Sequence, residues 1–171
     1  AKLANINVHY MRALSDEDLL ATLLAALPYL PNGDAFAARL TPERRRQLLV
    51  AMPLLKDRAK TLVDLVDRAD FIMAGRPLPI DAAARALLSA EARTLLRDLL
   101  PTLTGVGNWS AAATEAVVKL FAASRELKLG SIAQPLRAAL TGKAASPGIF
   151  DVLAVLGKSE SLGRIQDCVE A

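Results

Sequence analysis

The sequence has one cysteine and one histidine, which excludes several kinds of chemistry. Cys168 has no second cysteine for an intrachain disulfide or a cysteine-based metal site, and it suits a reducing compartment. His9 has no second ligand in view, so a surface position is expected. The patterns HExxH, CxxC, GxSxG and the P-loop are all missing. We therefore predict no catalytic centre and no metal site.

Long apolar runs and a charge excess are also lacking. No apolar run approaches the roughly 20 residues that span a bilayer, and the first residues lack the pattern of a signal peptide. The 21 basic and 18 acidic residues leave a formal charge of only +3, so any basic surface must be local. The sequence does not begin with methionine, from which we infer a piece of a longer protein.

The sequence is rich in alanine and leucine. Over 171 residues it is 53% hydrophobic and 23% charged, as globular domains are, while aromatic residues make up 4%. Its β-branched runs are short, so the composition favours an all-helical protein. Gly75, Pro77 and Pro79 form the clearest break in the chain. We therefore predict an all-α fold of two small helical bundles in tandem, residues 1–76 and 77–171.

Local signals predict where individual helices begin and end. Apolar residues recur at helical spacing from Leu3 to Tyr10, so a helix is predicted over the first dozen residues. A helix with Thr41 as its cap is predicted to end near Pro53, and a helical pattern runs through residues 109–130. The other predicted helix starts are Ser15, Asp81, Ser89, Ser146 and Ser159.

Residues 128–157 are the part of the chain that packing alone explains least. They read KLGSIAQPLRAALTG, then a short basic loop, then SPGIFDVLAVLG. Gly142 is predicted to end one helix in the left-handed conformation, and Ser146 and Pro147 suit the N-cap and first position of the next. The free N–H groups at the start of that second helix would form a site that an anion can use.

Arg137 is the charged residue of interest in this stretch. It lies one position round from Leu136 and Leu140, so it is expected to point towards solvent or a ligand. On the residues alone, a surface ion pair is the first interpretation. The alternative is recognition of an unstacked base, with Arg137 bonding the base edge and Ile149 and Phe150 forming an apolar ledge. Phe150 suits the core better than the ledge.

The two segments quoted above resemble the C-terminal anticodon-binding region of bacterial glutamyl-tRNA synthetases, which are of class I. The segments KLANINVHYMR and LKDRAKTLVDL resemble other parts of that region, so the resemblance covers nearly the whole chain. It implies an all-α fold with two anticodon-binding subdomains. It also implies that Arg137, Ser146, Pro147 and Ile149 read the first anticodon base.

The resemblance gives Arg58 a role as well. Arg58 matches an arginine that is implied to recognise the third anticodon base in enzymes that charge only glutamate tRNA, so it favours this discriminating type. The alternative is an ion pair with Asp57 or Asp64. Trp109 is expected to anchor a helix in the core rather than to stack on a base. The candidates for phosphate contacts are Lys143, Lys128 and Arg45, although the run 44–46 is otherwise typical of a solvated helix face.

The function that the resemblance implies is tRNA recognition within glutamate–tRNA ligase, which attaches glutamate to its tRNA with ATP and Mg²⁺. The HIGH and KMSKS signatures of such enzymes are absent here, so this chain alone is expected to be inactive and to hold no cofactor. We expect a cytoplasmic monomer without a membrane partner. The alternatives are a helical protein-interaction module, with the ledge as its groove, and a freestanding regulator derived from a synthetase.

Overall fold

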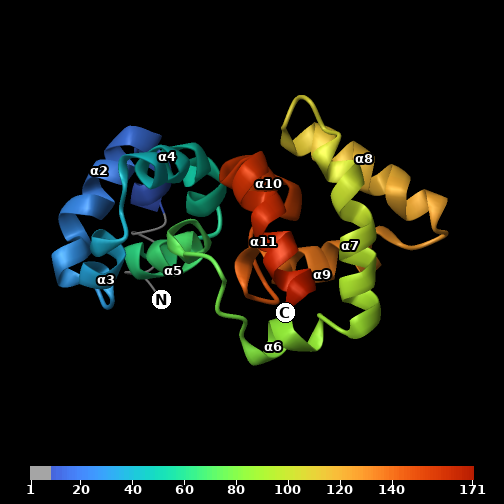
Figure 1. Ribbon diagram of the computed structural model, residues 1–171. Helices are drawn as coiled ribbons and strands as arrows, with labels where there is room; N and C mark the ends of the chain where they lie inside the picture. The colour runs from blue at the N-terminus through green and yellow to red at the C-terminus, as the bar shows by residue number, and fades with distance from the viewer. Residues whose placement is uncertain (1–8) are drawn as a thin grey trace. The chain divides into compact units, whose positions relative to one another are not determined.

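The computed structural model describes residues 9–171, and every regular element in that part of the chain is helical (Figure 1). The prediction of an all-α protein is confirmed. The chain divides into two compact units, Ala1–Ala74 and Gly75–Ala171. This division falls close to the predicted boundary, while the assignment of the two halves to anticodon-binding subdomains stays a prediction. Among the described residues, no helix is long and apolar enough to cross a bilayer.

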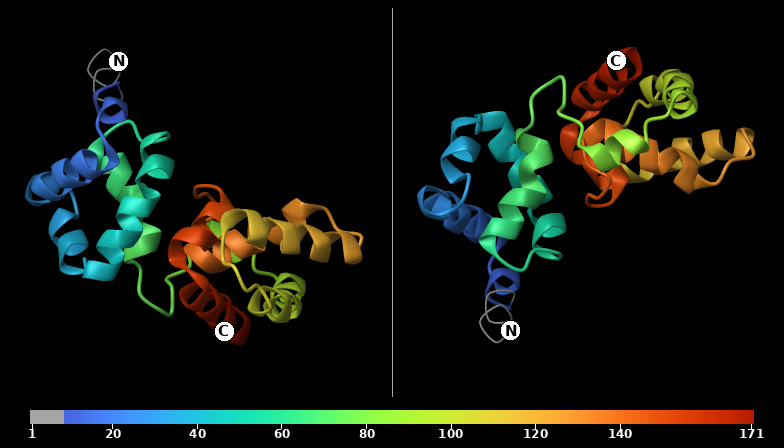
Figure 2. Two further views of the ribbon diagram at one scale, coloured as in Figure 1. Left: turned by 90° about the horizontal axis from the view of Figure 1, so that it is seen from above. Right: turned by 90° about the horizontal axis from the view of Figure 1, so that it is seen from below.

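Within the described residues, the first unit consists of short helices around one core (Figure 2). Its elements are α2 (Asp16–Ala26), η1 (Leu27–Tyr29), α3 (Gly33–Ala38), α4 (Pro42–Lys56) and α5 (Leu62–Met73). α4 contacts both α2 and α5, and the three helices contribute the fully buried leucines Leu23, Leu48 and Leu65. The predicted helix over the first dozen residues lies mostly outside the part of the chain that the structure describes. Within the described part, residues 9–13 are helical.

The second unit is a bundle centred on one helix. Its elements are α6 (Ala82–Ala86), α7 (Ala90–Thr104), α8 (Ala111–Ser124), α9 (Leu129–Thr141), α10 (Ile149–Leu156) and α11 (Lys158–Glu170). α9 contacts all the others, and α7 also packs along α11. The core is built from fully buried side chains such as Leu96, Leu136 and Val152. Because α9 lies at the centre, its C-terminal end is a fixed point of the unit.

Most helix starts follow the predicted caps. A side-chain oxygen of the cap accepts a hydrogen bond from the backbone N–H three residues later, which satisfies one of the donors that the first turn leaves free. The N···O distances are 3.1 Å at Ser15, 3.2 Å at Thr41, 2.7 Å at Asp81 and 3.2 Å at Ser89. Thr61 caps α5 and Ser110 caps α8 in the same way. These starts are therefore determined locally.

Four predicted boundaries are wrong. α4 runs through Pro53 to Lys56, because the fully buried Leu55 holds its last turn in the core. α8 ends at Ser124, and Glu126 takes a positive φ of 56° before α9 begins. α10 begins at Ile149 with Gly148 as its N-cap, so neither Ser146 nor Pro147 has the predicted capping role. The last helix begins at Lys158, one residue before Ser159.

Candidate functional site

Arg137 lies on α9 and joins that helix to the turn before α10. Its Nη1 atom donates to the carbonyl oxygen of Ser146 at 3.2 Å, to that of Pro147 at 2.7 Å, and to the Ser146 hydroxyl. The structure therefore brings together three of the four residues predicted to read one base. It also changes the expected role of Arg137, because the side chain is partly buried and one edge of its guanidinium is bound within the protein.

The loop that follows α9 is fixed at its beginning. Gly142 ends α9 with a φ of 71°, as predicted, and its carbonyl oxygen accepts a 3.0 Å hydrogen bond from the N–H of Asp81. The Thr141 hydroxyl donates to Arg137 O at 2.8 Å and accepts from Lys143 N at 3.2 Å. A Cβ atom on Gly142 would lie 2.2 Å from the carbonyl oxygen of Pro79, so the position requires glycine.

A buried arginine supports the same helix end. Arg164 on α11 is 2% exposed, and its Nη1 donates to the carbonyl oxygen of Leu140 at 2.8 Å. Its Nε donates to Glu160 at 2.7 Å, which pairs the charge. A cation at the negative end of a helix dipole is favourable, and it satisfies a carbonyl that the last turn leaves free. Sequence reasoning missed Arg164, since Leu140 is distant in sequence.

The apolar ledge predicted beside Arg137 is wrong for Ile149. That side chain is 4% exposed and belongs to the core, while Phe150 is only partly buried, the reverse of the expected arrangement. Pro147 is buried as well. The carboxylate of Asp151 lies against Gly148, the N-cap of α10, and supplies negative charge there. The predicted anion site at this helix start is therefore already matched by a side chain.

The two lysines predicted to contact phosphate lie at opposite ends of α9. Lys128 precedes the helix and Lys143 follows it, and both are exposed. With a rise of about 1.5 Å per residue, the helix separates them by about 20 Å. Only Lys143 therefore belongs to the corner formed by Arg137, Ser146 and Pro147. We call this corner, with Lys143, the α9–α10 corner.

In the first unit, Arg58 lies in the loop after α4 and is exposed. Its predicted alternative partner Asp64 is engaged by Arg68, whose Nε lies 2.9 Å from the carboxylate. Among residues 9–171, the Arg58 side chain has no hydrogen bond or ion pair. The ion-pair interpretation is therefore wrong within the described chain, and the guanidinium is available to a ligand.

The basic run 44–46 has a mixed character. Arg44 is partly buried, and it donates to Arg39 O at 2.9 Å and to Ala74 O at 3.4 Å. Arg46 pairs with Glu43. Arg45 is exposed and has no side-chain partner in the part of the chain that the structure describes. The predicted solvated face is thus wrong for Arg44, and Arg45 remains the candidate for a phosphate contact.

The remaining single residues are structural or exposed. The Trp109 indole N–H donates to Leu153 O at 2.8 Å and so anchors the start of α8 to α10, but the residue is partly buried and not in the core as predicted. Burial raises the pKa of the Cys168 thiol, so little thiolate forms near neutral pH. His9 is exposed. Over residues 9–171, no three His, Cys, Asp or Glu side chains are grouped so as to hold a metal ion.

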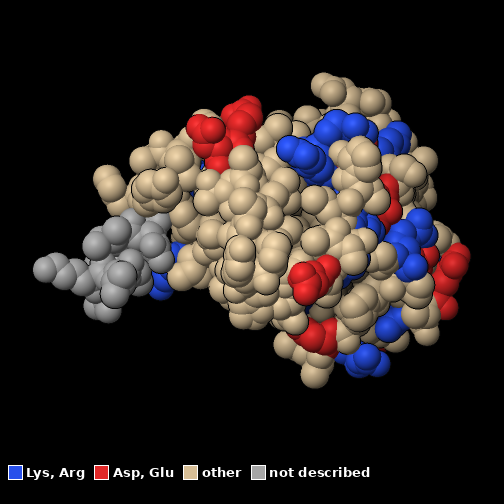
Figure 3. All heavy atoms as spheres, turned by 90° about the vertical axis from the view of Figure 1, so that its left-hand side faces the viewer, with Lys and Arg blue, Asp and Glu red and all other residues tan. Residues whose placement is uncertain are grey.

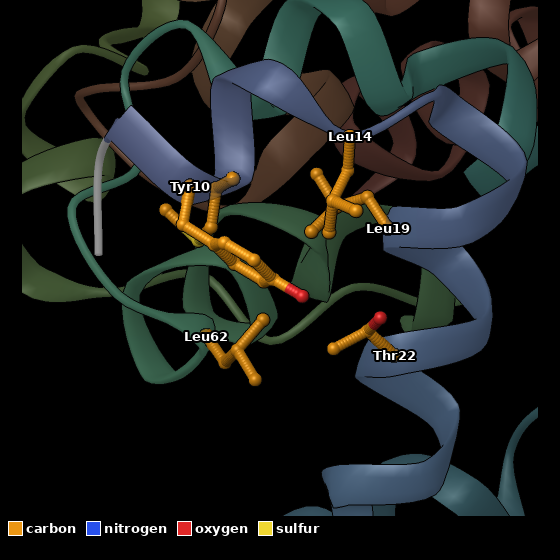
Figure 4. A pocket seen from close by; sticks show the side chains of 6 residues that line it. Tyr10, Leu14, Leu19, Thr22 and Leu62 are labelled. Atoms are coloured by element: carbon orange, nitrogen blue, oxygen red, sulfur yellow. The ribbon is translucent and has the colours of Figure 1, made fainter. Parts of the chain in front are cut away.

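The first unit also has an apolar cavity of 230 Å³ (Figure 4). Figure 4 shows the Tyr10 ring beside Leu62, with its hydroxyl directed towards the side of Thr22. The rest of the lining is Met11, Leu14 and Leu19. Two hydroxyls are the only side-chain oxygens in this lining, and it contains no carboxylate, imidazole or amine. The lining therefore lacks a base that could activate either hydroxyl as a nucleophile.

The face drawn in Figure 3 carries both signs of charge. Acidic and basic side chains are separated there by a broad uncharged area, and neither sign covers the face. This agrees with the small net charge of +3. Any recognition of a polyanion must therefore depend on a few well-placed cations such as those at the α9–α10 corner.

Comparison with known proteins identifies relatives of the whole chain. The family model described as the anticodon binding domain matches residues 18–169. The glutamate–tRNA ligase of Bradyrhizobium sp. is 56% identical over 167 residues, which are 98% of this chain and 35% of that protein. Glutamate–tRNA ligase 1 of Xanthobacter autotrophicus is 59% identical over 166 residues, 97% of this chain and 35% of that protein.

A solved structure shares the fold. The crystal structure of a glutamate tRNA ligase from Elizabethkingia meningosepticum, in complex with its amino acid, matches with a TM-score of 0.75 at 22% identity. The match covers 98% of this chain and 32% of that one. The chain thus spans about a third of the length of the relatives it matches, 35% for the two ligases above.

Proposed function

The chain belongs to the anticodon-binding domain family, and from this premise we propose that it forms the tRNA-recognition part of a glutamate–tRNA ligase. The complete enzyme would attach glutamate to its tRNA in the cytoplasm, using ATP and Mg²⁺. This chain would supply binding, and the chemistry would be carried out by another part of the enzyme. Glutamate tRNA is then the partner.

The α9–α10 corner carries this proposal, because Arg137, Ser146 and Pro147 come together there although nine or ten residues separate Arg137 from the other two. Anticodon bases are unstacked in a loop, where a protein reads them by stacking and by hydrogen bonds to their edges. One edge of the Arg137 guanidinium is held by the turn, so its orientation is fixed before RNA arrives. A base can stack on the plane of such a held guanidinium, and the partly exposed Phe150 lies close by in sequence.

The buried positions have a supporting role in this proposal. Ile149 and Pro147 cannot offer an exposed surface, so they act by shaping the turn that Arg137 holds. Lys143, exposed at the same corner, is suited to a phosphate of the bound loop. Arg58 would read the third base from the first unit, as an unpaired and exposed guanidinium is able to do. That reading favours an enzyme that charges only glutamate tRNA.

The test is a fluorescence titration of the chain with glutamate tRNA and with tRNAs changed at single anticodon positions. Binding should weaken steeply with salt, since lysine and arginine would displace counterions from phosphates. Arg137→Ala should cost about 1–3 kcal/mol of discrimination at the first base, the usual size for a good base contact. Lys119→Ala removes an exposed cation that is paired with Glu115 on α8, and it serves as the control for charge alone.

Equal losses for matched and mismatched anticodons would rule out base reading by Arg137. Absence of any salt-sensitive tRNA binding would rule out the proposed function. The competing interpretation, a protein-interaction module, depended on an exposed ledge that included Ile149. Since that side chain is buried, the ledge offers no support to it.

A further inference from the structure

We propose that Arg12 is a positioning residue for the loop that carries Arg58, an inference that rests on the proposed function of Arg58. The Nη2 atom of Arg12 donates to the carbonyl oxygen of Asp57 at 2.7 Å. Asp57 directly precedes Arg58 in the chain, and 45 residues separate it from Arg12. A short bond from a charged donor is stronger than a neutral one, so it restrains the peptide unit that leads into Arg58.

The loop has a fixed base that makes this restraint effective. Ala59 is 1% exposed, and its N–H donates to Leu55 O at 3.0 Å, so the residue after Arg58 is held in the core. On the other side, Lys56 lies 2.6 Å from the Asp16 carboxylate and ties the end of α4 to the start of α2. Arg58 is thus, with Asp57, an exposed residue of a loop that is bound on both sides.

Arg12 adds a third restraint, because it binds the carbonyl oxygen of Asp57, which lies between these anchors. Within residues 9–171, the other hydrogen bond of the peptide between Asp57 and Arg58 is the weak 3.3 Å bond from Arg58 N to Leu55 O. A flexible loop would have to be ordered when a base binds, and that entropy cost would reduce affinity for the correct base. Arg12 therefore acts on recognition through Arg58 rather than by touching the base.

Arg12 is itself exposed, so it also has the chemistry of a direct phosphate contact. The two roles differ in a measurable way. Removing a phosphate contact weakens binding to all sequences alike, and this loss adds to the effect of removing Arg58. Removing a positioning residue lowers the selectivity for one base. Its removal has no further effect once Arg58 has been removed as well.

The experiment is a double-mutant cycle with Arg12→Ala and Arg58→Ala, read out with tRNAs that are matched or mismatched at the third anticodon base. Arg12→Ala alone should reduce third-base discrimination by about threefold to tenfold, as expected for loss of one hydrogen bond from a charged donor at an exposed site. In the Arg58→Ala background it should change discrimination by less than about twofold. Arg12→Lys should restore part of the effect, because an ammonium can also donate to a carbonyl.

Amide hydrogen exchange on the free protein provides a readout that needs no RNA. Exchange at Arg58 and Ala59 should become faster in Arg12→Ala, whereas the amide of Leu65, bonded to Thr61 O on α5, should be unchanged. Arg39→Ala is the control variant, since it removes an arginine of the same unit that pairs with Asp70 instead. Its exchange at Arg58 and Ala59 should equal that of the wild type.

Each outcome decides between explanations. Unchanged exchange at Arg58 and Ala59 would overturn the positioning role, whatever the RNA measurements show. Faster exchange together with additive binding losses would overturn the route through Arg58 and assign Arg12 to phosphate binding. Faster exchange in a protein whose wild type shows no third-base discrimination would overturn the proposed function of Arg58, and with it this inference.

Discussion

Gly142→Ala should destabilise the second unit by about 1.5–3.5 kcal/mol. The residue ends α9 with a φ of 71°, and this left-handed conformation costs an L-residue about 1–2 kcal/mol. The new Cβ would lie 2.2 Å from the Pro79 carbonyl oxygen, which is backbone and cannot rotate away. The shift that relieves this contact stretches the 3.0 Å bond from Asp81 N to Gly142 O, which adds about 0.5–1.5 kcal/mol.

Gly130→Ala is the matched control within the same helix. Gly130 lies in the first turn of α9, is exposed, and would place its Cβ in open space. Replacing a helical glycine by alanine reduces the entropy lost on folding, so this variant should be more stable than the wild type by up to about 1 kcal/mol. Both variants replace glycine by alanine, but their changes in the free energy of unfolding should have opposite signs.

The assay is urea unfolding followed by tryptophan fluorescence. Trp109 is the only tryptophan in the sequence, and its indole donates to Leu153 O, so the signal reports on the second unit alone. A stability of Gly142→Ala within about 0.5 kcal/mol of the wild type would refute the reasoning, because surface substitutions without strain have effects of that size. Equal destabilisation by both variants would refute it too, since the strain would then not be specific to the end of α9.

Four further predictions concern the charged groups. Arg164→Ala should destabilise by about 3 kcal/mol, because it leaves the partners of a buried guanidinium unpaired. Arg68→Ala breaks a pair of the same i,i+4 spacing that is about one-third exposed, and it should cost less than about 1 kcal/mol in thermal unfolding followed by circular dichroism. The hydrogen bonds of Arg76 lower the pKa of Asp167, so their stabilisation is complete above about pH 4 and is lost as the pH falls through the lowered pKa. Asp167→Asn should therefore flatten the acid side of a stability–pH curve, and a curve identical to the wild type would contradict this. Gly163→Ala should flatten the curve in the same way, because its Cβ would lie 2.0 Å from the Arg76 guanidinium and displace it. If the acid side of the curve stays as in the wild type, the ion pair tolerates the methyl group.

Helix starts could be predicted wherever the signal is local. Ser15, Thr41, Asp81 and Ser89 each bond a backbone N–H three residues away, so the short sequence pattern contains both partners. Ser146 has the same appearance in the sequence, but its hydroxyl is engaged by Arg137, nine residues away, and by Pro147 O. A competing long-range donor changed the outcome, and a pattern of neighbouring residues cannot reveal it.

The sequence predicted which residues of the candidate site come together, but it did not predict which of their side chains are exposed. Family resemblance selected Arg137, Ser146 and Pro147, and they do lie together. The apolar ledge failed because hydrophobicity does not tell which of two adjacent side chains faces the core, and here Ile149 does. Arg12 and Arg164 were missed, since their carbonyl acceptors are 45 and 24 residues away. Every residue has a backbone carbonyl, so the residue type does not show which carbonyl a distant arginine binds.

The division of the chain at Ala74 has a consequence for how binding strength would arise under the proposed function. Arg58 belongs to one unit and the α9–α10 corner to the other. Each unit would bind its own nucleotide, and the chain would bind tRNA through two linked contacts. The first contact then raises the effective concentration of the second, and modest individual affinities multiply into avidity. Swapping either half for a relative's would be expected to change which nucleotide is preferred at that position while leaving the other preference intact.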